Sequence, residues 1–168
     1  MTDKDMAVCV DRALCVAAWD GDTEAVVALL DAGADVHVWA DAPLWEAAMR
    51  GHAETMKALL DAGADQDIAL VVAAENGIVE LVRELLARDA GFRTSRGLAL
   101  LMAALALAAG NGHTDTVRAL LGAGAGLHAG RDEAGRRAAE SGHADTVRVL
   151  KKWKPSRKKK PRAGSRTA

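Results

Sequence analysis

The sequence has very few aromatic residues: its 168 positions hold no tyrosine, one phenylalanine and four tryptophans. This scarcity excludes a core built from large rings. Half of the residues are apolar, but alanine supplies much of that half. The chain is about the size of one ordinary domain. We therefore expect a core of closely packed helices that meet through small side chains.

The chain also has few cysteines and no long apolar run. Cys9 and Cys15 are the only two cysteines and lie six residues apart in a predicted helix, so they point from different faces and are poorly placed for a disulfide. The most apolar stretch, Leu98 to Ala109, has 12 residues, whereas a membrane span needs about 20. Residues 1–5 are charged and polar and do not resemble a secretory signal. We expect a soluble, intracellular protein of the cytoplasm and/or the nucleus.

Charge is divided unevenly along the chain. Residues 151–168 hold nine basic residues and no acidic one, which leaves 13 basic against 23 acidic residues in 1–150, a net charge of -10. Residues 154–168 contain Pro155, Pro161 and Gly164 and almost nothing apolar, a composition typical of disorder. The sequence predicts an acidic folded body followed by a disordered basic tail.

An internal repeat organises the body. The pattern Ala-Ala-x-x-Gly occurs five times, and its glycines are 30, 26, 35 and 30 residues apart. These glycines are Gly21, Gly51, Gly77, Gly112 and Gly142. A fixed period of this length is typical of stacked repeat architectures.

Each repeat predicts two helices separated by the glycine. An acidic residue follows every glycine by three positions, where it favours the start of a helix, and apolar residues then recur at helical spacing. Three residues before each of the first four alanine pairs stands a leucine of the preceding helix: Leu14, Leu44, Leu70 and Leu105. Further glycines at Gly33, Gly63 and Gly124 are suited to left-handed helix ends. A single unit cannot bury its apolar face alone, so the units must stack.

The repeat resembles the ankyrin family. The segment Met49-Arg50-Gly51-His52-Ala53-Glu54, continuing to Leu59-Leu60-Asp61-Ala62-Gly63-Ala64-Asp65, is similar to the family's Gly-His-x-Glu, Leu-Leu and Gly-Ala-Asp pattern, and residues 111–125 repeat it. The resemblance implies an all-α solenoid of about five stacked helix-turn-helix units with short connections, over a domain at 5–153. The approximate repeats are 6–36, 37–66, 67–92, 93–127 and 128–153, before the tail at 154–168.

Catalytic motifs are missing from the sequence. It contains no Gly-x-Ser-x-Gly, no Gly-Lys-Ser/Thr phosphate loop and no His-Glu-x-x-His. His52, His113 and His143 recur once per repeat and do not converge, and the resemblance implies a structural role for them, bonding across the turn. We therefore expect neither an enzyme nor a cofactor or metal site. A converging cluster of Cys, His and acidic side chains would revive an enzymatic hypothesis.

The resemblance also implies where a partner binds. Ankyrin proteins contact partners through the connections and through the two residues before the glycine turn, which face the concave side. The candidates are Trp19, Asp20, Met49, Arg50, Glu75, Asn76, Gly110, Asn111, Glu140 and Ser141. Trp19 and Met49 are the strongest, because large apolar side chains make good interface anchors. Trp39 is a further candidate in a connection; alternatively, Trp39 and Trp45 fill space there.

Two functions follow as hypotheses. The first is a monomeric adaptor whose concave face binds a protein partner. The alternative is a nucleic-acid-associated or nuclear-targeted protein that acts through Arg157, Lys158, Lys159 and Lys160, because this cluster resembles a nuclear localisation sequence and basic clusters also bind nucleic acid. A tail that only keeps the protein soluble remains a third interpretation.

Overall fold

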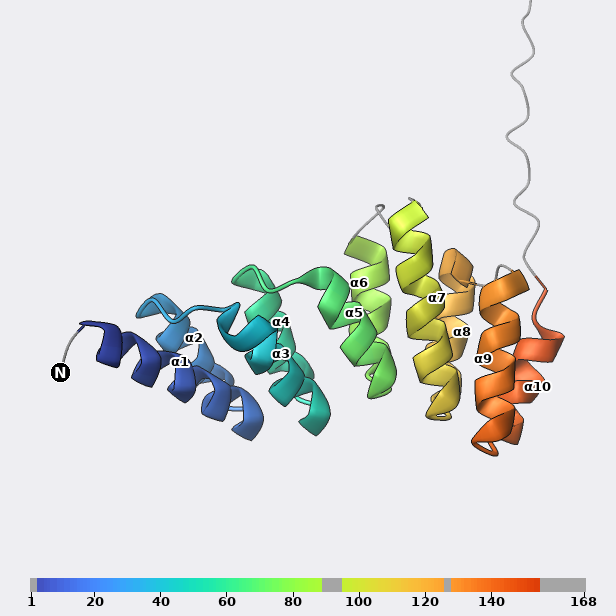
Figure 1. Ribbon diagram of the computed structural model, residues 1–168, viewed down its shortest axis with the longest axis horizontal. Coiled ribbons are helices and arrows are strands. Elements are labelled where there is room, and N and C mark those ends of the chain that lie inside the picture. Colours follow the sequence, from blue (N-terminus) through green and yellow to red (C-terminus); the bar gives the residue numbers. More distant parts are fainter. Residues whose placement is uncertain (1–2, 89–94, 126–127, 155–168) are drawn as a thin grey trace, which may run out of the picture.

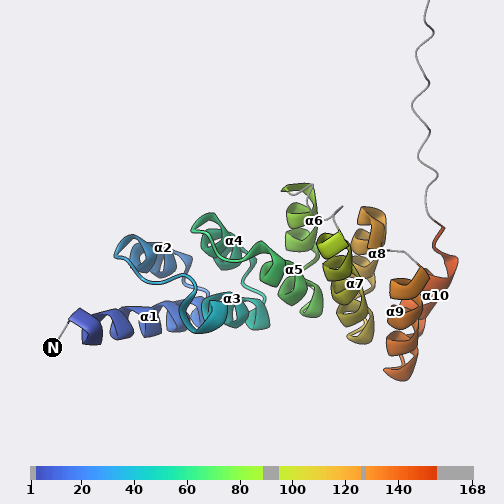
Figure 2. The ribbon, with the colours of Figure 1, turned by 45° about the horizontal axis from the view of Figure 1, so that its top comes forward.

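The fold is a stack of helix pairs. The computed structural model describes residues 3–88, 95–125 and 128–154, and within these ranges every regular element is helical (Figures 1 and 2). The first helices of the five pairs are α1 (Asp3–Asp20), α3 (Val38–Arg50), α5 (Gln66–Glu75), α7 (Ser95–Gly110) and α9 (His128–Glu140). The second helices are α2 (Thr23–Asp31), α4 (Ala53–Asp61), α6 (Val79–Arg88), α8 (Thr114–Leu120) and α10 (Ala144–Lys152), and a π-helical turn, η2 (Leu121–Ala125), follows α8. The predicted all-α solenoid is confirmed.

The turn inside each pair depends on its glycine. All five repeat glycines adopt φ between +73° and +79°, a left-handed conformation that costs other residues steric strain. The second helix begins two residues after this glycine, as at Thr23, where Asp22 caps it by accepting the N–H of Ala25 at 2.9 Å. Gly33, Gly63 and Gly124 also have positive φ, at +92°, +104° and +112°. The predicted left-handed helix ends are confirmed.

The core runs continuously along the stack between the two layers of helices. The four predicted leucines Leu14, Leu44, Leu70 and Leu105 are at most 1% exposed. The alanine pairs beside them are buried as well, apart from Ala139. At the far end, Trp153 packs partly buried against this core, as expected of a residue that covers the last helix.

The repeat histidines join neighbouring layers. His52 Nε2 lies 3.1 Å from the carbonyl oxygen of Trp19, and His113 Nε2 lies 2.9 Å from that of Glu75. Each ring also covers the turn glycine of the preceding pair: a Cβ added to Gly21 or Gly77 would lie 2.5 or 2.4 Å from it. The predicted structural bond therefore runs from one layer to the turn of the layer before it.

The joint between the second and third pairs is built differently. Ile78 occupies the position of the repeat histidine, and a Cβ on Gly51 would meet nothing within 4 Å. Two ion pairs between α4 and α6 link this joint instead: the half-buried pair Lys57–Glu84 at 3.5 Å and the exposed pair Arg88–Asp61 at 3.2 Å. The direction of the helix axes also changes between α3 and α5 (Figure 1).

The connection at this joint is short, in keeping with the 26-residue spacing of its two glycines. Only residues 62–65 separate α4 from α5, and Asp65 caps α5 by accepting the N–H groups of Asp67 and Ile68 at 2.7 and 3.3 Å. The short connection that the ankyrin resemblance implies is confirmed at this joint.

The predicted basic cluster of Arg157, Lys158, Lys159 and Lys160 is outside the described ranges. No helix within those ranges combines the length and the apolar character that crossing a bilayer would require.

Candidate functional site

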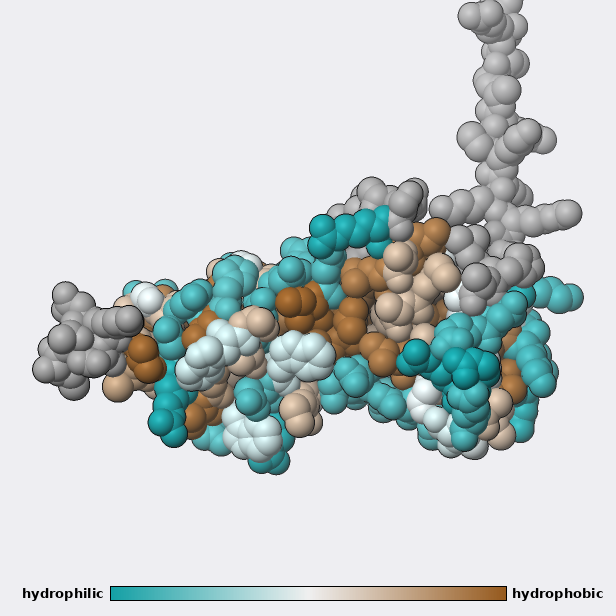
Figure 3. Space-filling model, viewed as in Figure 1, coloured by the Kyte–Doolittle hydropathy of each residue, from teal (hydrophilic) through white to brown (hydrophobic). Residues whose placement is uncertain are grey.

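The candidate site is the surface formed by the first helix of every pair, which we call the first-helix face. It faces the viewer in Figures 1 and 3. Hydrophobic residues gather over α5 and α7, whereas α9 presents a hydrophilic surface (Figure 3). Among the predicted partner-binding residues, Trp19 is 37% and Met49 62% exposed, although large apolar side chains are usually buried.

Two predicted residues from neighbouring layers meet on this face. The guanidinium carbon of Arg50 lies 4.1 Å from the ring centroid of Trp19, a geometry in which the cation is attracted to the negative face of the ring. Met49 precedes Arg50 at the end of α3. With this contact in place, Trp19 keeps 37% of its surface exposed.

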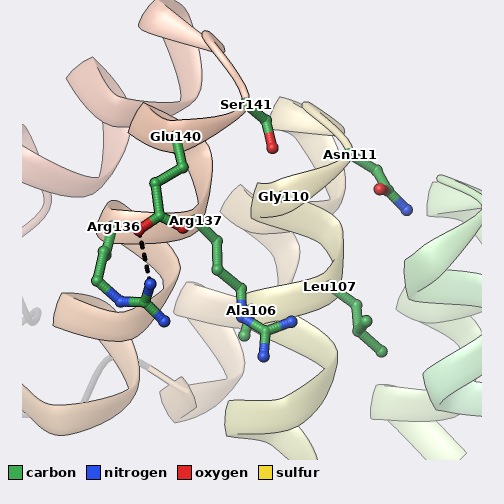
Figure 4. Close-up of a pocket in the computed structure, with 8 residues that line it drawn as sticks. All are labelled: Ala106, Leu107, Gly110, Asn111, Arg136, Arg137, Glu140 and Ser141. Carbon is green, nitrogen blue, oxygen red and sulfur yellow. Dashed lines mark hydrogen bonds and ion pairs between the residues drawn. The ribbon is translucent and has the colours of Figure 1, made fainter.

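A first hollow of about 380 Å³ joins four of the predicted residues, Gly110, Asn111, Glu140 and Ser141 (Figure 4). It lies between α7 and α9 and is polar. Arg136 Nη1 donates to Glu140 at 2.6 Å, and Arg137 Nε donates to Glu133 at 2.7 Å. The hydrogen bonds from Arg137 and Arg136 hold the pKa of Glu133 below its ordinary value. The three charged side chains that line this hollow, Arg136, Arg137 and Glu140, are thus already engaged in ion pairs.

A second hollow, of about 340 Å³, lies between α1 and α3. Its lining residues are Arg12, Cys15, Val16, Trp19, Trp39 and Glu46. Trp39 is 60% exposed, so its side chain does not fill the space of a connection. It belongs to a left-handed stretch at the start of α3, where Trp39, Ala40 and Asp41 have φ of 48°, 57° and 60°. Asp41 is buried there and pairs with His37 Nδ1 at 3.0 Å.

A third hollow, of about 490 Å³, lies across α3, α5 and α7, and sequence reasoning missed it. Trp45, Ile68, Val71, Ala99, Leu100 and Ala103 form its apolar lining, with Asp65, Asp67 and Arg96 beside them. Arg96 Nη2 lies 3.0 Å from Asp67. The interpretation of Trp45 as a space-filling residue of a connection is wrong, because Trp45 lies within α3 and is 38% exposed.

Helical spacing was the signal that could have found the third hollow. Trp45 lies four residues before Met49, and Val71 lies four residues before Glu75. Residues four apart occupy one face of a helix. Extending the candidate pairs backward by one helical turn would have included both.

The remaining candidates contribute less to the open surface. Asp20 lines a different hollow, formed by α1 and α2 of the first pair, together with Asp22 and Ala25. The amide of Asn76 donates to the carbonyl oxygen of Val72 in its own helix at 2.9 Å. The amide of Asn111 donates to the carbonyl oxygen of Glu75 at 2.8 Å and so helps to join two layers. Hydrogen bonds within the stack occupy the two amides.

Within the described residues no three His, Cys, Asp or Glu side chains group closely enough to hold a metal ion. Cys9 and Cys15 are both free thiols. Burial, Glu46 and Asp11 raise the pKa of Cys15, which lowers its thiolate fraction and its reactivity.

Comparison with known families agrees with this architecture. A family model of three ankyrin repeats matches residues 14–96 and 70–160, which together span most of the chain. The chain belongs to the ankyrin repeat family. Ankyrin repeats generally mediate protein–protein interaction and are typically not catalytic. A search of curated proteins found no match to this ankyrin-repeat chain.

Proposed function

We propose that this ankyrin-repeat protein is an adaptor that binds a protein partner through its first-helix face. The observation that carries the proposal is the exposure of Trp19, Trp39 and Trp45 on one face, beside two adjoining hollows. Aromatic residues are enriched among the residues that dominate binding energies, especially where a partner excludes water from them. A monomer in the cytoplasm or the nucleus is part of the same proposal.

Covering this exposed apolar area with a partner contributes favourable binding free energy. Met49 and Trp39 are each at least 60% exposed, and burying apolar surface is favourable by about 25 cal/mol per Å². The hollow around Trp45, Ile68 and Val71 is lined mainly by apolar side chains. A segment inserted there would exchange hydrated apolar surface for packed contacts.

Alanine substitution of Trp19, Met49 and Arg50 tests the placement of the site. Partners captured by the wild-type protein should bind the triple variant at least about tenfold more weakly, because truncating anchor residues commonly costs over ~1.4 kcal/mol in total. Val16→Ala and Val27→Ala form a matched pair: both valines are exposed, but Val16 lines the hollow near Trp19 whereas Val27 lies on α2. Only Val16→Ala should weaken capture. Unchanged capture by the triple variant would refute the placement.

A second candidate function is association with nucleic acid or nuclear import through the basic segment. It is favoured by the nine basic residues, with no acidic one, in 151–168. Binding of this kind weakens steeply with salt, because the contacts release counterions from the phosphates. Truncation after Trp153 should abolish it and leave capture by the first-helix face intact. Retained nucleic-acid binding by the truncated chain would exclude this candidate.

A further inference from the structure

The hollow between α1 and α3 combines aromatic rings with an unpaired carboxylate. Trp19 and Trp39 both line it, and Glu46 lies at its α3 side. Among the described residues, Glu46 makes no ion pair or side-chain hydrogen bond. The ring faces of tryptophan carry negative electrostatic potential, so they attract cations and disfavour anions.

A cationic side chain of the protein already stacks on one of these two tryptophan rings. Arg50 lies over Trp19 at 4.1 Å, so one face of this ring already holds a guanidinium group and a guest must use the remaining ring surface. Arg12 also lines the hollow and opposes a second cation there. The hollow thus holds one carboxylate and one guanidinium, and the two tryptophans favour a positively charged guest. The net charge of -10 over residues 1–150 acts in the same direction at longer range.

The neighbouring hollow, across α3, α5 and α7, favours a different kind of side chain from the partner. Glu46 lines the hollow between α1 and α3, whereas Trp45, the residue before it, lines the apolar hollow toward α5 and α7. Helix α3 therefore separates two adjoining sites of contrasting chemistry. A segment lying across α3 would place one side chain in each.

From this arrangement we propose that the bound protein inserts a lysine or arginine side chain between Trp19 and Trp39, beside Glu46, and an apolar side chain beside Trp45. The inference rests on the proposed function of the first-helix face and deepens it by naming the chemistry of the partner segment. The partner presents a segment in which basic and apolar residues are close together.

A random twelve-residue peptide library displayed on phage, selected against the full chain, tests the proposal. Selected peptides should carry an excess of Lys and Arg over Asp and Glu, together with large apolar residues. Glu46→Gln should weaken their binding about fivefold, as expected for loss of one charge contact at a partly exposed site. Arg12→Gln should strengthen it, because a competing cation is removed. Glu80→Gln, which makes the same charge change on α6, should leave binding unchanged.

Replacing the basic residue of a selected peptide by Gln completes a double-mutant cycle with Glu46→Gln. The peptide change should weaken binding to the wild-type protein and have little effect on the Glu46→Gln variant. Peptides that need Trp45 but show no basic excess and no coupling to Glu46 would overturn this inference and leave the proposed function standing. If no selected peptide depends on Trp19 or Trp45, both fall. Selection that succeeds only against the chain ending at Trp153 would assign the hollow to the chain's own basic residues and would also overturn the inference.

Discussion

The contact between Gly77 and His113 yields the sharpest test of how the layers are joined. Replacing Gly77 by Ala places a Cβ 2.4 Å from His113 Nδ1 and 2.7 Å from its Cγ, at a backbone φ of +73°. Gly51 is a matched control, because its φ is +76° and an added Cβ meets nothing within 4 Å. Both substitutions introduce the same backbone strain, but only Gly77→Ala adds a steric clash with the His113 ring.

The magnitudes separate these two effects. A left-handed alanine costs about 1–2 kcal/mol, and we expect Gly51→Ala to destabilise the protein by this amount. In the Gly77→Ala variant the His113 ring must move away, which breaks its 2.9 Å hydrogen bond to the carbonyl oxygen of Glu75. That bond contributes about 0.5–1.5 kcal/mol. Gly77→Ala should therefore cost about 1 kcal/mol more than Gly51→Ala, before any packing loss around the ring.

Chemical denaturation followed by far-ultraviolet circular dichroism measures both free energies of unfolding. In a His113→Ala background the collision disappears, so Gly77→Ala should cost no more there than Gly51→Ala costs in the wild-type protein. Equal costs for the two glycine substitutions in the wild-type background would refute the reasoning. So would a cost of Gly77→Ala that does not change when His113 is absent.

Three further predictions concern strain, charge and buried hydroxyls. Ala40→Gly should raise the thermal midpoint, because relieving a left-handed alanine with φ of 57° gains about 1–2 kcal/mol. The folded-state pKa of Glu133 lies below its ordinary value of 4.5. This residue therefore stabilises the folded protein above pH 4.5, and the stabilisation is lost as pH falls through the lowered pKa. As pH is lowered through this range, the unfolding midpoint of Glu133→Gln should fall less than that of the wild-type protein. Thr114→Val should cost about 1–3 kcal/mol in denaturant titrations, because it removes the 2.8 Å partner of the buried Thr146 hydroxyl, and adding Thr146→Val should recover part of that loss.

The regular part of the fold was predictable because the helices and turns of each repeat are determined by residues close to them in the sequence. The structure of a turn or a helix start depends on glycines, acidic residues and leucines that lie only a few positions away. The role of His52 shows the limit of such reasoning. Its partner is the carbonyl oxygen of Trp19, 33 positions earlier, and only the stacking of the layers brings the two together.

The candidate site was predictable only in part, for two reasons. The left-handed residues Trp39, Ala40 and Asp41 interrupt the start of α3, and Trp39 among them is exposed beside the second hollow. No local pattern announces three consecutive non-glycine residues with positive φ. The other reason is that hydrogen bonds within the stack compete with a partner for polar side chains. Asn76 and Asn111 stand at predicted positions, but their amides donate to backbone carbonyl groups within the stack.

The position of the apolar hollow relates binding to the construction of the stack. Histidine bonds or Thr–Thr bonds join the first pair to the second, the third to the fourth and the fourth to the fifth. In the described part of the chain neither kind of bond crosses from the second pair to the third. The hollow around Trp45, Val71 and Leu100 spans that joint. A partner seated there would contact both sides of the joint and, since ligands stabilise the state they bind, would reinforce the stack where its own contacts are fewest.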